Sequence, residues 1–415
     1  MFLEKRMYAL MVVALGILTL TSCSKDNDED DEPVTPPVNT VLQGSLNSSM
    51  TLTADKQWTL KGYVYVPAGV VLTIQPGTTI VSDVTVKGAL CIERGGQIIA
   101  NGTASNPIVF TSGKANGSKA PGDWGGIVIL GKAKTNRTST PVIEGGLDRP
   151  YGGTDDNDNS GSLKYVRIEY AGIAAFANSE INGLTLGGVG RGTTLENIQV
   201  IYGNDDAYEF FGGTVDAKNL VAFGTADDDF DFDFGYSGRI QFAVALRDPQ
   251  FVDNGDAGNG IEADNDGSGS TATPNTKPVI SNMTLIGANN ATGTLANHNF
   301  GNRWRRAVRF DIRNSVILGW PKAGISLESA ASAQAYLDGN SVLKYNVIHS
   351  NDNANTFKVD AAASGVLTAA AFETKALAEG NVKVSSPDNI LTAPFNLSAP
   401  NFGVVAGSAA ATGVD

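Results

Sequence analysis

The stretch Leu163-Lys-Tyr-Val-Arg-Ile-Glu-Tyr-Ala-Gly172 carries the unit that decides the fold, because apolar and polar residues alternate along it and a glycine ends it. Related units start at Leu195, Ile280, Ile312 and Val342. Leu163 and Leu195 are 32 residues apart, Ile280 and Ile312 are also 32 apart, and Val342 follows Ile312 after 30. A period near 30 residues with strand-like alternation predicts one supersecondary unit that is repeated along the chain.

Short runs rich in β-branched and aromatic residues fill the first part of the chain, between Gly and Asn turns. They are Trp58–Val66, Val70–Ile80, Ala89–Ile99 and Pro107–Thr111. Such strands suit a parallel β-helix, in which each turn adds one strand spacing of about 4.8 Å and left-handed corners accept Gly and Asn. Hairpin signals, which a β-sandwich or a propeller would need, are sparse. The pattern therefore predicts an all-β chain coiled into a parallel β-helix.

The composition excludes several classes of protein. Of 415 residues, 42% are hydrophobic, which is enough to bury a large core and excludes a wholly disordered chain. The 48 Gly residues disfavour a helical protein. The formal charge of −13 argues against a nucleic-acid partner, because phosphate contacts need the opposite sign. Two Cys and two His leave little for thiol–imidazole catalysis, a cysteine zinc site or a disulfide framework.

The N-terminal segment predicts a targeting signal rather than a part of the fold. Residues 1–22 combine a charged start with a short apolar stretch, as in a signal peptide, and precede Cys23. The sequence Leu20-Thr-Ser-Cys23 resembles the bacterial lipobox, which predicts that Cys23 is acylated and anchors the protein in a membrane. An ordinary cleaved signal with a chance cysteine is the alternative.

Residues 23–40 are acidic and rich in proline, which predicts a tether that holds residues 41–415 away from the membrane. Acidic residues directly after the lipid-bearing cysteine also resemble the surface-export signal of Bacteroidetes-type lipoproteins. We therefore expect a lipid-anchored protein of the outer membrane that faces the cell exterior.

The ends of a coil need covering elements, because the first and last turns otherwise expose their interior. Residues from Val41 to Trp58 are expected to cover the first turn. Near the other end, the segment from Thr368 to Glu379 is the best helix in the chain and is followed by Gly380. We expect this helix to be an appendage near the C-terminal end of a single β-helix domain, residues 41–415.

Four motifs resemble those of a family of bacterial outer-membrane lipoproteins. They are Asp123–Gly131, Gly203–Gly213, Asp227–Gly235 and Asn259–Asn265, and the resemblance covers roughly residues 42–415. It implies a right-handed, pectate-lyase-like β-helix and a place beside TonB-dependent uptake systems. It implies no particular activity.

The sharpest chemical feature is the acidic stretch from Asp227 to Phe234. Strict alternation places one set of side chains inside and the other outside. The expected inward residues are Phe230, Phe232 and Phe234, and the expected outward residues are Asp229, Asp231 and Asp233. One turn earlier lies the similar segment Asp205–Phe210.

We expect these two segments to stack with an offset of 24 residues, which places Tyr208 on Phe232 and Phe210 on Phe234. This offset keeps one interior apolar, and it places Asp205 and Glu209 on Asp229 and Asp233. An offset of 23, which superposes the Asp-Asp pairs but mixes the faces, is the alternative. With either offset at least five carboxylates share a small surface, where their repulsion raises pKa values or requires a cation.

Oxygen ligands without His or Cys point to a structural Ca²⁺ ion. The loops Asp156–Gly161 and Glu262–Gly267 also have oxygen ligands at alternate positions before a glycine, although solvated acidic loops are common. The candidate calcium ligands are Asp205, Glu209, Asp229, Asp231, Asp233, Asp156, Asp158, Glu262, Asp264 and Asp266.

The one basic segment is Asn302–Arg313. Alternation directs Trp304, Val308, Phe310 and Ile312 inward, and Arg305, Arg309 and Arg313 outward. The outward row could bind carboxylate or sulfate groups of a ligand. Compensation of the neighbouring acidic turns is the plainer interpretation.

Three functions remain open. The first is a surface lipoprotein that binds or presents a glycan or another small ligand beside a TonB-dependent transporter. The second is a calcium-dependent polysaccharide lyase or a hydrolase, for which the candidate catalytic residues are Asp205, Asp206, Asp228, Asp229, Arg239 and Arg305. The third is a structural or adhesive surface protein. The first is preferred, because the Gly-His-Gly and Arg-Ile-Lys partners of a polygalacturonase-like hydrolase are missing and a fold alone gives no activity.

Overall fold

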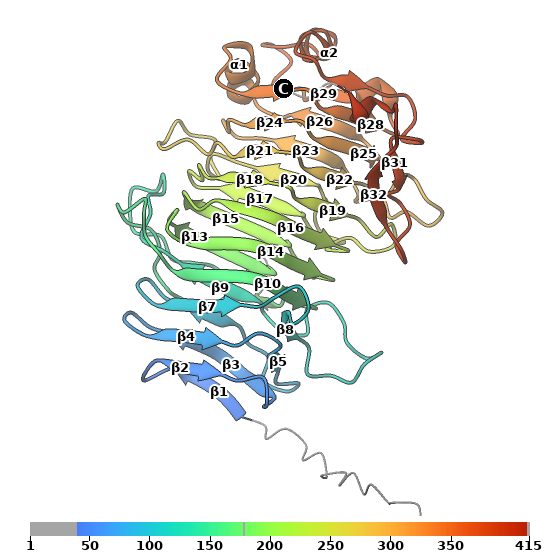
Figure 1. Cartoon of the computed structure of the whole chain (residues 1–415). Coiled ribbons are helices and arrows are strands. Elements are labelled where there is room, and N and C mark those ends of the chain that lie inside the picture. The colour runs from blue at the N-terminus through green and yellow to red at the C-terminus, as the bar shows by residue number, and fades with distance from the viewer. Residues whose placement is uncertain (1–39, 177–178, 413–415) are drawn as a thin grey trace, which may run out of the picture. The chain divides into compact units, whose positions relative to one another are not determined.

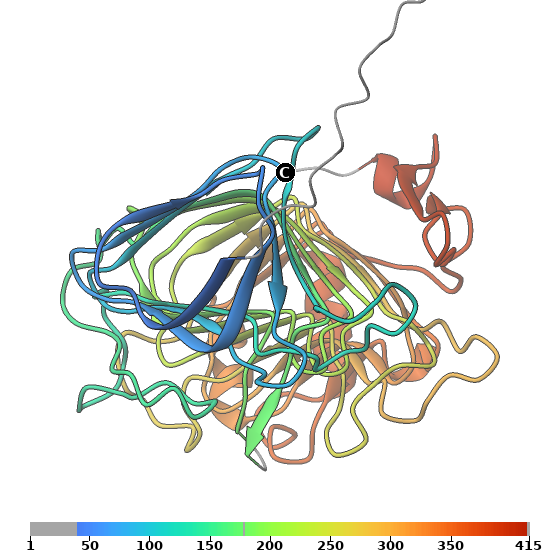
Figure 2. The same cartoon turned by 90° about the horizontal axis from the view of Figure 1, so that it is seen from below.

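The computed structural model describes residues 40–176 and 179–412. Twenty-eight parallel strands form one continuous hydrogen-bonded network in which each turn of the chain lies over the one before (Figure 1). The view from below shows the strands of successive turns following one another around a common interior (Figure 2). The predicted parallel β-helix is therefore confirmed.

Each turn contributes strands to three sheets, which we call sheets I, II and III. Several long strands bend and belong to two of them. The strands shared by sheets I and III are β1 (Thr40–Ser45) and β3 (Trp58–Val66), and those shared by sheets II and III are β10 (Gly161–Glu169), β14 (Thr194–Ile201) and β16 (Ala217–Phe223).

The other strands belong to one sheet each. Sheet I adds β6 (Leu90–Ile92), β9 (Ile127–Leu130), β13 (Leu184–Val189), β15 (Tyr208–Gly213), β17 (Phe230–Asp233), β20 (Ile261–Ala263), β23 (Phe300–Trp304), β26 (Ala323–Leu327) and β29 (Phe357–Val359). Sheet II adds β2 (Met50–Leu52), β4 (Val71–Ile74), β7 (Gln97–Asn101), β18 (Arg239–Gln241), β21 (Val279–Ser281), β24 (Asp311–Arg313) and β27 (Val342–Lys344). Sheet III adds β5 (Thr79–Ser82), β8 (Ile108–Thr111), β19 (Val244–Leu246), β22 (Thr284–Ile286), β25 (Val316–Trp320), β28 (Val347–Ser350) and β30 (Val382–Lys383).

Sheets II and III meet at a corner made by one residue with positive φ in each of seven successive turns. Asparagine tolerates this left-handed conformation better than other residues with a Cβ atom, because its side chain bonds locally. The seven residues, with φ between 49° and 59°, are Tyr165, Asn197, Asn219, Phe242, Asn282, Asn314 and Tyr345. Asn thus has the corner role that the sequence predicted for it, but aromatic residues hold three of the same positions.

The interior is filled by side chains that stack from turn to turn. Tyr208 lies on Phe230 with ring centroids 5.2 Å apart, and Phe210 lies on Phe232 at 5.1 Å. Trp304, one of the inward residues predicted in the basic segment, stacks on Phe310 at 4.5 Å. The predicted inward residues Trp304, Val308, Phe310 and Ile312 are all buried.

The register of the long repeats agrees with the sequence, whereas that of the acidic segments does not. Leu163 pairs with Leu195, and Ile280 pairs with Ile312, as predicted. Ile312 pairs with Leu343, one residue beyond the predicted start of the next unit.

The predicted offset of 24 between the two acidic segments is wrong, because Tyr208 pairs with Phe230 and Glu209 with Asp231, which is an offset of 22. Side-chain alternation determines only whether an offset is even, so 22 and 24 both keep the aromatic rings inside. The number of residues in the intervening turn decides between them, and the strand pairing fixes it at 22. Phe234 has φ 49°, so the strand ends at Asp233 and the third expected inward ring lies outside, against Phe211.

Additional elements cover the C-terminal end of the coil. The predicted helix is α2 (Ala369–Ala378), capped by Thr368, and a second helix, α1 (Ala330–Leu337), was not predicted. An antiparallel pair, β31 (Leu391–Ala393) and β32 (Asn401–Val404), follows α2 and lies beside sheet III (Figure 1). The remaining elements are β11 (Ala174–Phe176), β12 (Ser179–Glu180), and the short 3₁₀ helices η1 (Asn353–Asn355) and η2 (Ala409–Ala411). No helix among the described residues is both long enough and apolar enough to cross a membrane.

Candidate metal centre

One column of outward side chains runs along sheet I through successive turns. Parallel pairing at constant register places equivalent residues directly over one another, one strand spacing apart. From β13 onward the column is Thr185, Glu209, Asp231, Glu262, Arg303, Ser326 and Lys358. Its charge therefore changes from acidic to basic between β20 and β23.

The acidic half of the column meets a group of carboxylates at the corner that precedes β15 and β17. Carboxylate oxygens of Asp205, Asp206 and Asp227 all lie within 4.8 Å of one another. The same is true of Asp206, Glu209 and Asp231. Asp206 belongs to both groups, so five carboxylates form one connected set, which we call the acidic cluster.

The acidic cluster is poorly solvated, and this determines its protonation. Asp206 and Glu209 are only 6% and 7% exposed. Burial, followed by the charges of Glu180 and Glu144, raises the pKa of Asp205 to about 8. Burial and neighbouring carboxylates likewise raise the pKa of Asp206, Glu209, Asp227 and Asp231 well above the ordinary range. Without a cation, the cluster therefore holds protons at neutral pH.

Hydrogen bonds between turns fix the position of these side chains. Asp206 Oδ1 accepts from the backbone N–H of Asp228 at 2.8 Å, and Asp228 Oδ1 accepts from that of Asn259 at 2.6 Å. The Asn182 side-chain amide donates to Glu209. Asp206 and Glu209 are thus held by adjacent turns, so the stacking of the coil positions the centre of the cluster.

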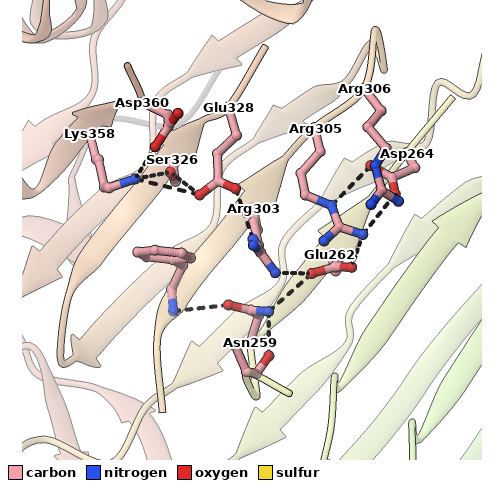
Figure 3. Close-up of polar contacts among 12 residues, drawn as sticks. Asn259, Glu262, Asp264, Arg303, Arg305, Arg306, Ser326, Glu328, Lys358 and Asp360 are labelled. Carbon is pink, nitrogen blue, oxygen red and sulfur yellow. Dashed lines mark hydrogen bonds and ion pairs between the residues drawn. The ribbon is translucent and has the colours of Figure 1, made fainter. Parts of the chain in front are cut away.

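Beyond the acidic cluster, sheet I is neutralised by its own ion pairs (Figure 3). Arg303 Nη1 lies 2.7 Å from Glu262 Oε2, and Arg303 Nε lies 3.0 Å from Glu328 Oε2. Arg305 pairs with Glu262 and, at 2.7 Å, with Asp264, which also pairs with Arg306 at 2.6 Å. The plainer interpretation of the arginines, charge compensation of acidic turns, thus describes Arg305.

Asp229 is separate from the acidic cluster, although the sequence placed it there. Its side chain is wholly buried and pairs with the equally buried Arg247 at 3.1 Å, and it accepts a hydrogen bond from Thr225 Oγ1 at 2.8 Å. Burial raises the pKa of Asp229 to about 6, against the opposing effect of Arg247. A buried carboxylate whose charge is already matched by a guanidinium is unsuited to a metal.

The remaining predicted calcium ligands are outside both groups of cluster carboxylates, although Glu262 pairs in register with Asp231. Several of them have partners within the chain. Asp156 pairs with Lys134 at 3.0 Å, and Asp158 Oδ2 accepts from the backbone N–H of Lys132 at 3.0 Å. Asp266 accepts from the N–H and hydroxyl groups of Ser268 and Ser270, and these bonds lower its pKa. The structure thus brings together Asp205, Glu209 and Asp231 but not Asp229, Asp233, Asp156, Asp158, Glu262, Asp264 or Asp266.

The predicted arginine row is not a row in the structure. Arg305 follows β23, whereas Arg313 lies in β24 of sheet II and pairs with Asp311 at 2.7 Å. Arg309 lines a separate hollow of about 310 Å³ beside α1. Arg239, named as a possible catalytic base, lies in β18 of sheet II, where Asp216 raises its pKa.

Three members of the site were missed as such from the sequence. Asp206, which was expected only as a catalytic candidate, belongs to both groups of carboxylates. Asp227 belongs to the acidic cluster, and Asn182 holds Glu209 from the preceding turn. Superposing the pairs Asp205-Asp206 and Asp227-Asp228 at an offset of 22 would have identified Asp227, because the same offset also keeps the rings inside. No pattern in the sequence points to Asn182.

The donor set fits a hard divalent cation. The acidic cluster supplies only carboxylate oxygens, which Ca²⁺ binds at about 2.3–2.6 Å, so ligand oxygens within 4.8 Å of one another match its shell. Buried, mutually repelling carboxylates bind a cation in place of protons. Both groups of ligands consist of Asp and Glu residues alone.

Comparison with known protein families agrees with the β-helix fold. A search of curated proteins found no match, and neither did a search of solved structures. A family model described as a pectate-lyase-like β-helix domain matches residues 44–387, which is most of the chain. The chain belongs to the family of pectate-lyase-like β-helix domains.

Proposed function

We propose that the protein binds an acidic glycan, or another ligand with anionic groups, through Ca²⁺ held by the acidic cluster of sheet I. The single observation that carries this proposal is that five carboxylates share one poorly solvated surface while the nearby arginines are already paired with other acids. Among residues 40–176 and 179–412, no ion pair reaches Asp205, Asp206, Asp227, Glu209 or Asp231. Ligand oxygens would reach a cation bound there from the side of Asp205, Asp227 and Asp231, which are only partly buried.

Calcium titration of the purified protein, after chelation and dialysis, tests the metal part of this proposal. We expect Ca²⁺ to bind and to raise the melting temperature, because it binds the folded state only. Asp206→Asn should weaken binding about 100-fold, since Asp206 belongs to both groups of ligands while its amide oxygen can still accept from Asp228 N–H.

The matched control is Asp216→Asn, which removes an exposed carboxylate of sheet II that is paired with Arg239. This variant should bind Ca²⁺ like the unchanged protein. If the unchanged protein shows no heat of binding and no shift in melting temperature at millimolar Ca²⁺, the metal centre is wrong. Binding of an acidic oligosaccharide that persists in chelator would separate the ligand from the metal.

We further propose that the protein acts at the cell surface, as an outer-membrane lipoprotein accessory to a TonB-dependent transporter. This part rests on the lipobox-like sequence before Cys23 and the acidic tether, which lie outside the described residues. Labelling of cells with a radioactive fatty acid, compared with a Cys23→Ala variant, tests the anchor. Protease accessibility of whole cells tests the orientation.

A polysaccharide lyase or hydrolase is the alternative, and one observation favours it. The pKa of about 8 keeps Asp205 protonated at neutral pH, as a general acid requires. Neighbouring carboxylates raise the pKa of Arg305, which leaves even less of the neutral guanidine that a general base requires at neutral pH. Release of unsaturated products from an acidic polysaccharide would establish a lyase, and release of reducing ends alone would establish a hydrolase.

A further inference from the structure

A second surface, on sheet III and its corner with sheet II, carries exposed aromatic rings at conformationally costly positions. Tyr165 and Phe242 occupy the left-handed corner with φ 49° and 59°. Their side chains are 37% and 51% exposed, and neither ring stacks on another ring in the described part of the chain. Each of these residues leaves more than a third of its surface in solvent, whereas Asn at the two intervening corners avoids most of the conformational cost.

We propose that this surface binds a neutral glycan, with the pyranose rings of the ligand stacked on Tyr165 and Phe242. The two residues are three turns apart, which is roughly 14 Å at the usual strand spacing. Between them lies a shallow hollow of about 350 Å³, floored by Val221 and Val244. Two flat apolar rings at the ends of such a hollow suit the C–H faces of a short oligosaccharide.

Amide groups line the hollow between the rings. Asn197 and Asn219 hold the two intervening corners, and Gln199 projects from the adjoining strand. None of these three side chains makes a hydrogen bond within the described chain. By contrast, Asn282 further along the same corner accepts from Gln241 at 3.0 Å and from Ser281 at 2.9 Å. The three amides can therefore donate to and accept from sugar hydroxyls.

The chemistry of the hollow favours a neutral ligand over a charged one. No charged side chain belongs to its lining. The surface is also distinct from the acidic cluster, which lies on sheet I, so this inference does not depend on the calcium proposal. Elsewhere on sheet III, β31 and β32 cover the outward face, where Phe395 and Phe402 pack against a cluster that includes Leu246 and Ile286. This cover reaches Leu246, at the end of β19 away from the corner that holds Phe242, and neither Tyr165 nor Phe242 belongs to the cluster.

Isothermal titration of the purified protein with cellohexaose, mannohexaose, xylohexaose and laminarihexaose tests the proposal. We expect at least one of these neutral hexasaccharides to bind, with the same affinity in Ca²⁺ and in EDTA. Tyr165→Asn and Phe242→Asn should each weaken binding about tenfold. Asn is the residue already present at the intervening corners, so both variants should fold.

The matched control is Tyr345→Asn, at the same corner but outside the hollow, where the ring lies against Gly380. It should bind like the unchanged protein. The proposal is overturned if no member of the panel binds, or if the double variant Tyr165→Asn/Phe242→Asn keeps its affinity. Concentration-dependent self-association that the double variant abolishes, without sugar binding, would instead make this surface a contact between copies of the chain. Binding that disappears in EDTA would place the sugar at the acidic cluster.

Discussion

Single carboxyl groups on sheet I determine how the molecule responds to pH. Asp205, Asp206 and Glu209 are held by backbone and side-chain bonds in positions where burial and mutual repulsion oppose their ionisation. Asp229, by contrast, has a buried counter-ion, because Arg247 pairs with it. The difference between these acids is not their residue type but whether a cationic side chain reaches them.

The raised pKa of Asp205 predicts that the protein loses stability as pH rises when no cation is present. The folded state keeps this proton up to about pH 8, whereas the unfolded chain loses it near the ordinary value of 3.8. The folded state thus binds more protons in this window, so the free energy of unfolding falls from about pH 4 to pH 8. Melting temperatures in EDTA should decrease over this range.

In Ca²⁺ the slope should flatten or reverse, because the ion binds the ionised carboxylates. Asp205→Asn, which cannot ionise at this position, should reduce the slope in EDTA, and the four other carboxylates of the cluster should maintain the rest. A melting temperature in EDTA that rises steadily from pH 5 to pH 8 would contradict the assignment of these pKa values.

At the scale of elements, the corner between sheets II and III shows how much a sequence pattern predicts. Asn at a constant place in successive turns indicates a left-handed corner, and the structure has such a corner with φ near 55° at Asn197 and Asn219. Alternation likewise predicts which residues face inward. Neither signal determines how many residues a turn contains, which is why Tyr208 was expected on Phe232 and lies on Phe230.

Asn197→Ala should destabilise the protein by about 1 kcal/mol, because alanine tolerates the left-handed conformation at φ 55° less well than asparagine. Asn197→Gly should change stability less, since glycine adopts positive φ freely. Urea unfolding measures both. Equal stability of the Ala and Gly variants would show that backbone conformation is unimportant at this corner.

At the scale of the whole coil, each turn contacts only its neighbours, so the last turns depend on what covers them. Phe372 of α2 is fully buried and packs edge-on against Tyr336 of α1 at 5.2 Å and Phe357 of β29 at 5.4 Å. The sequence predicted α2 as an appendage, but its role in closing the interior appears only in the structure.

Phe372→Ala should therefore destabilise the C-terminal end by about 3–5 kcal/mol, the usual range for a buried ring replaced by alanine. Hydrogen exchange should accelerate in β26, β28 and β29 while β4 and β7, many turns away, keep their protection. Uniform acceleration through all turns would mean that the coil unfolds as one cooperative unit.

The sequence by itself determined the repeat, the direction in which side chains face, the C-terminal helix and the excess of acidic residues, because each of these is a local or periodic property of the chain. Only the tertiary structure decided which acids share a surface. Asp227 joins the acidic cluster while Asp229, two residues later, pairs with Arg247, because turn length sets the stacking register and long-range packing supplies or withholds a counter-ion.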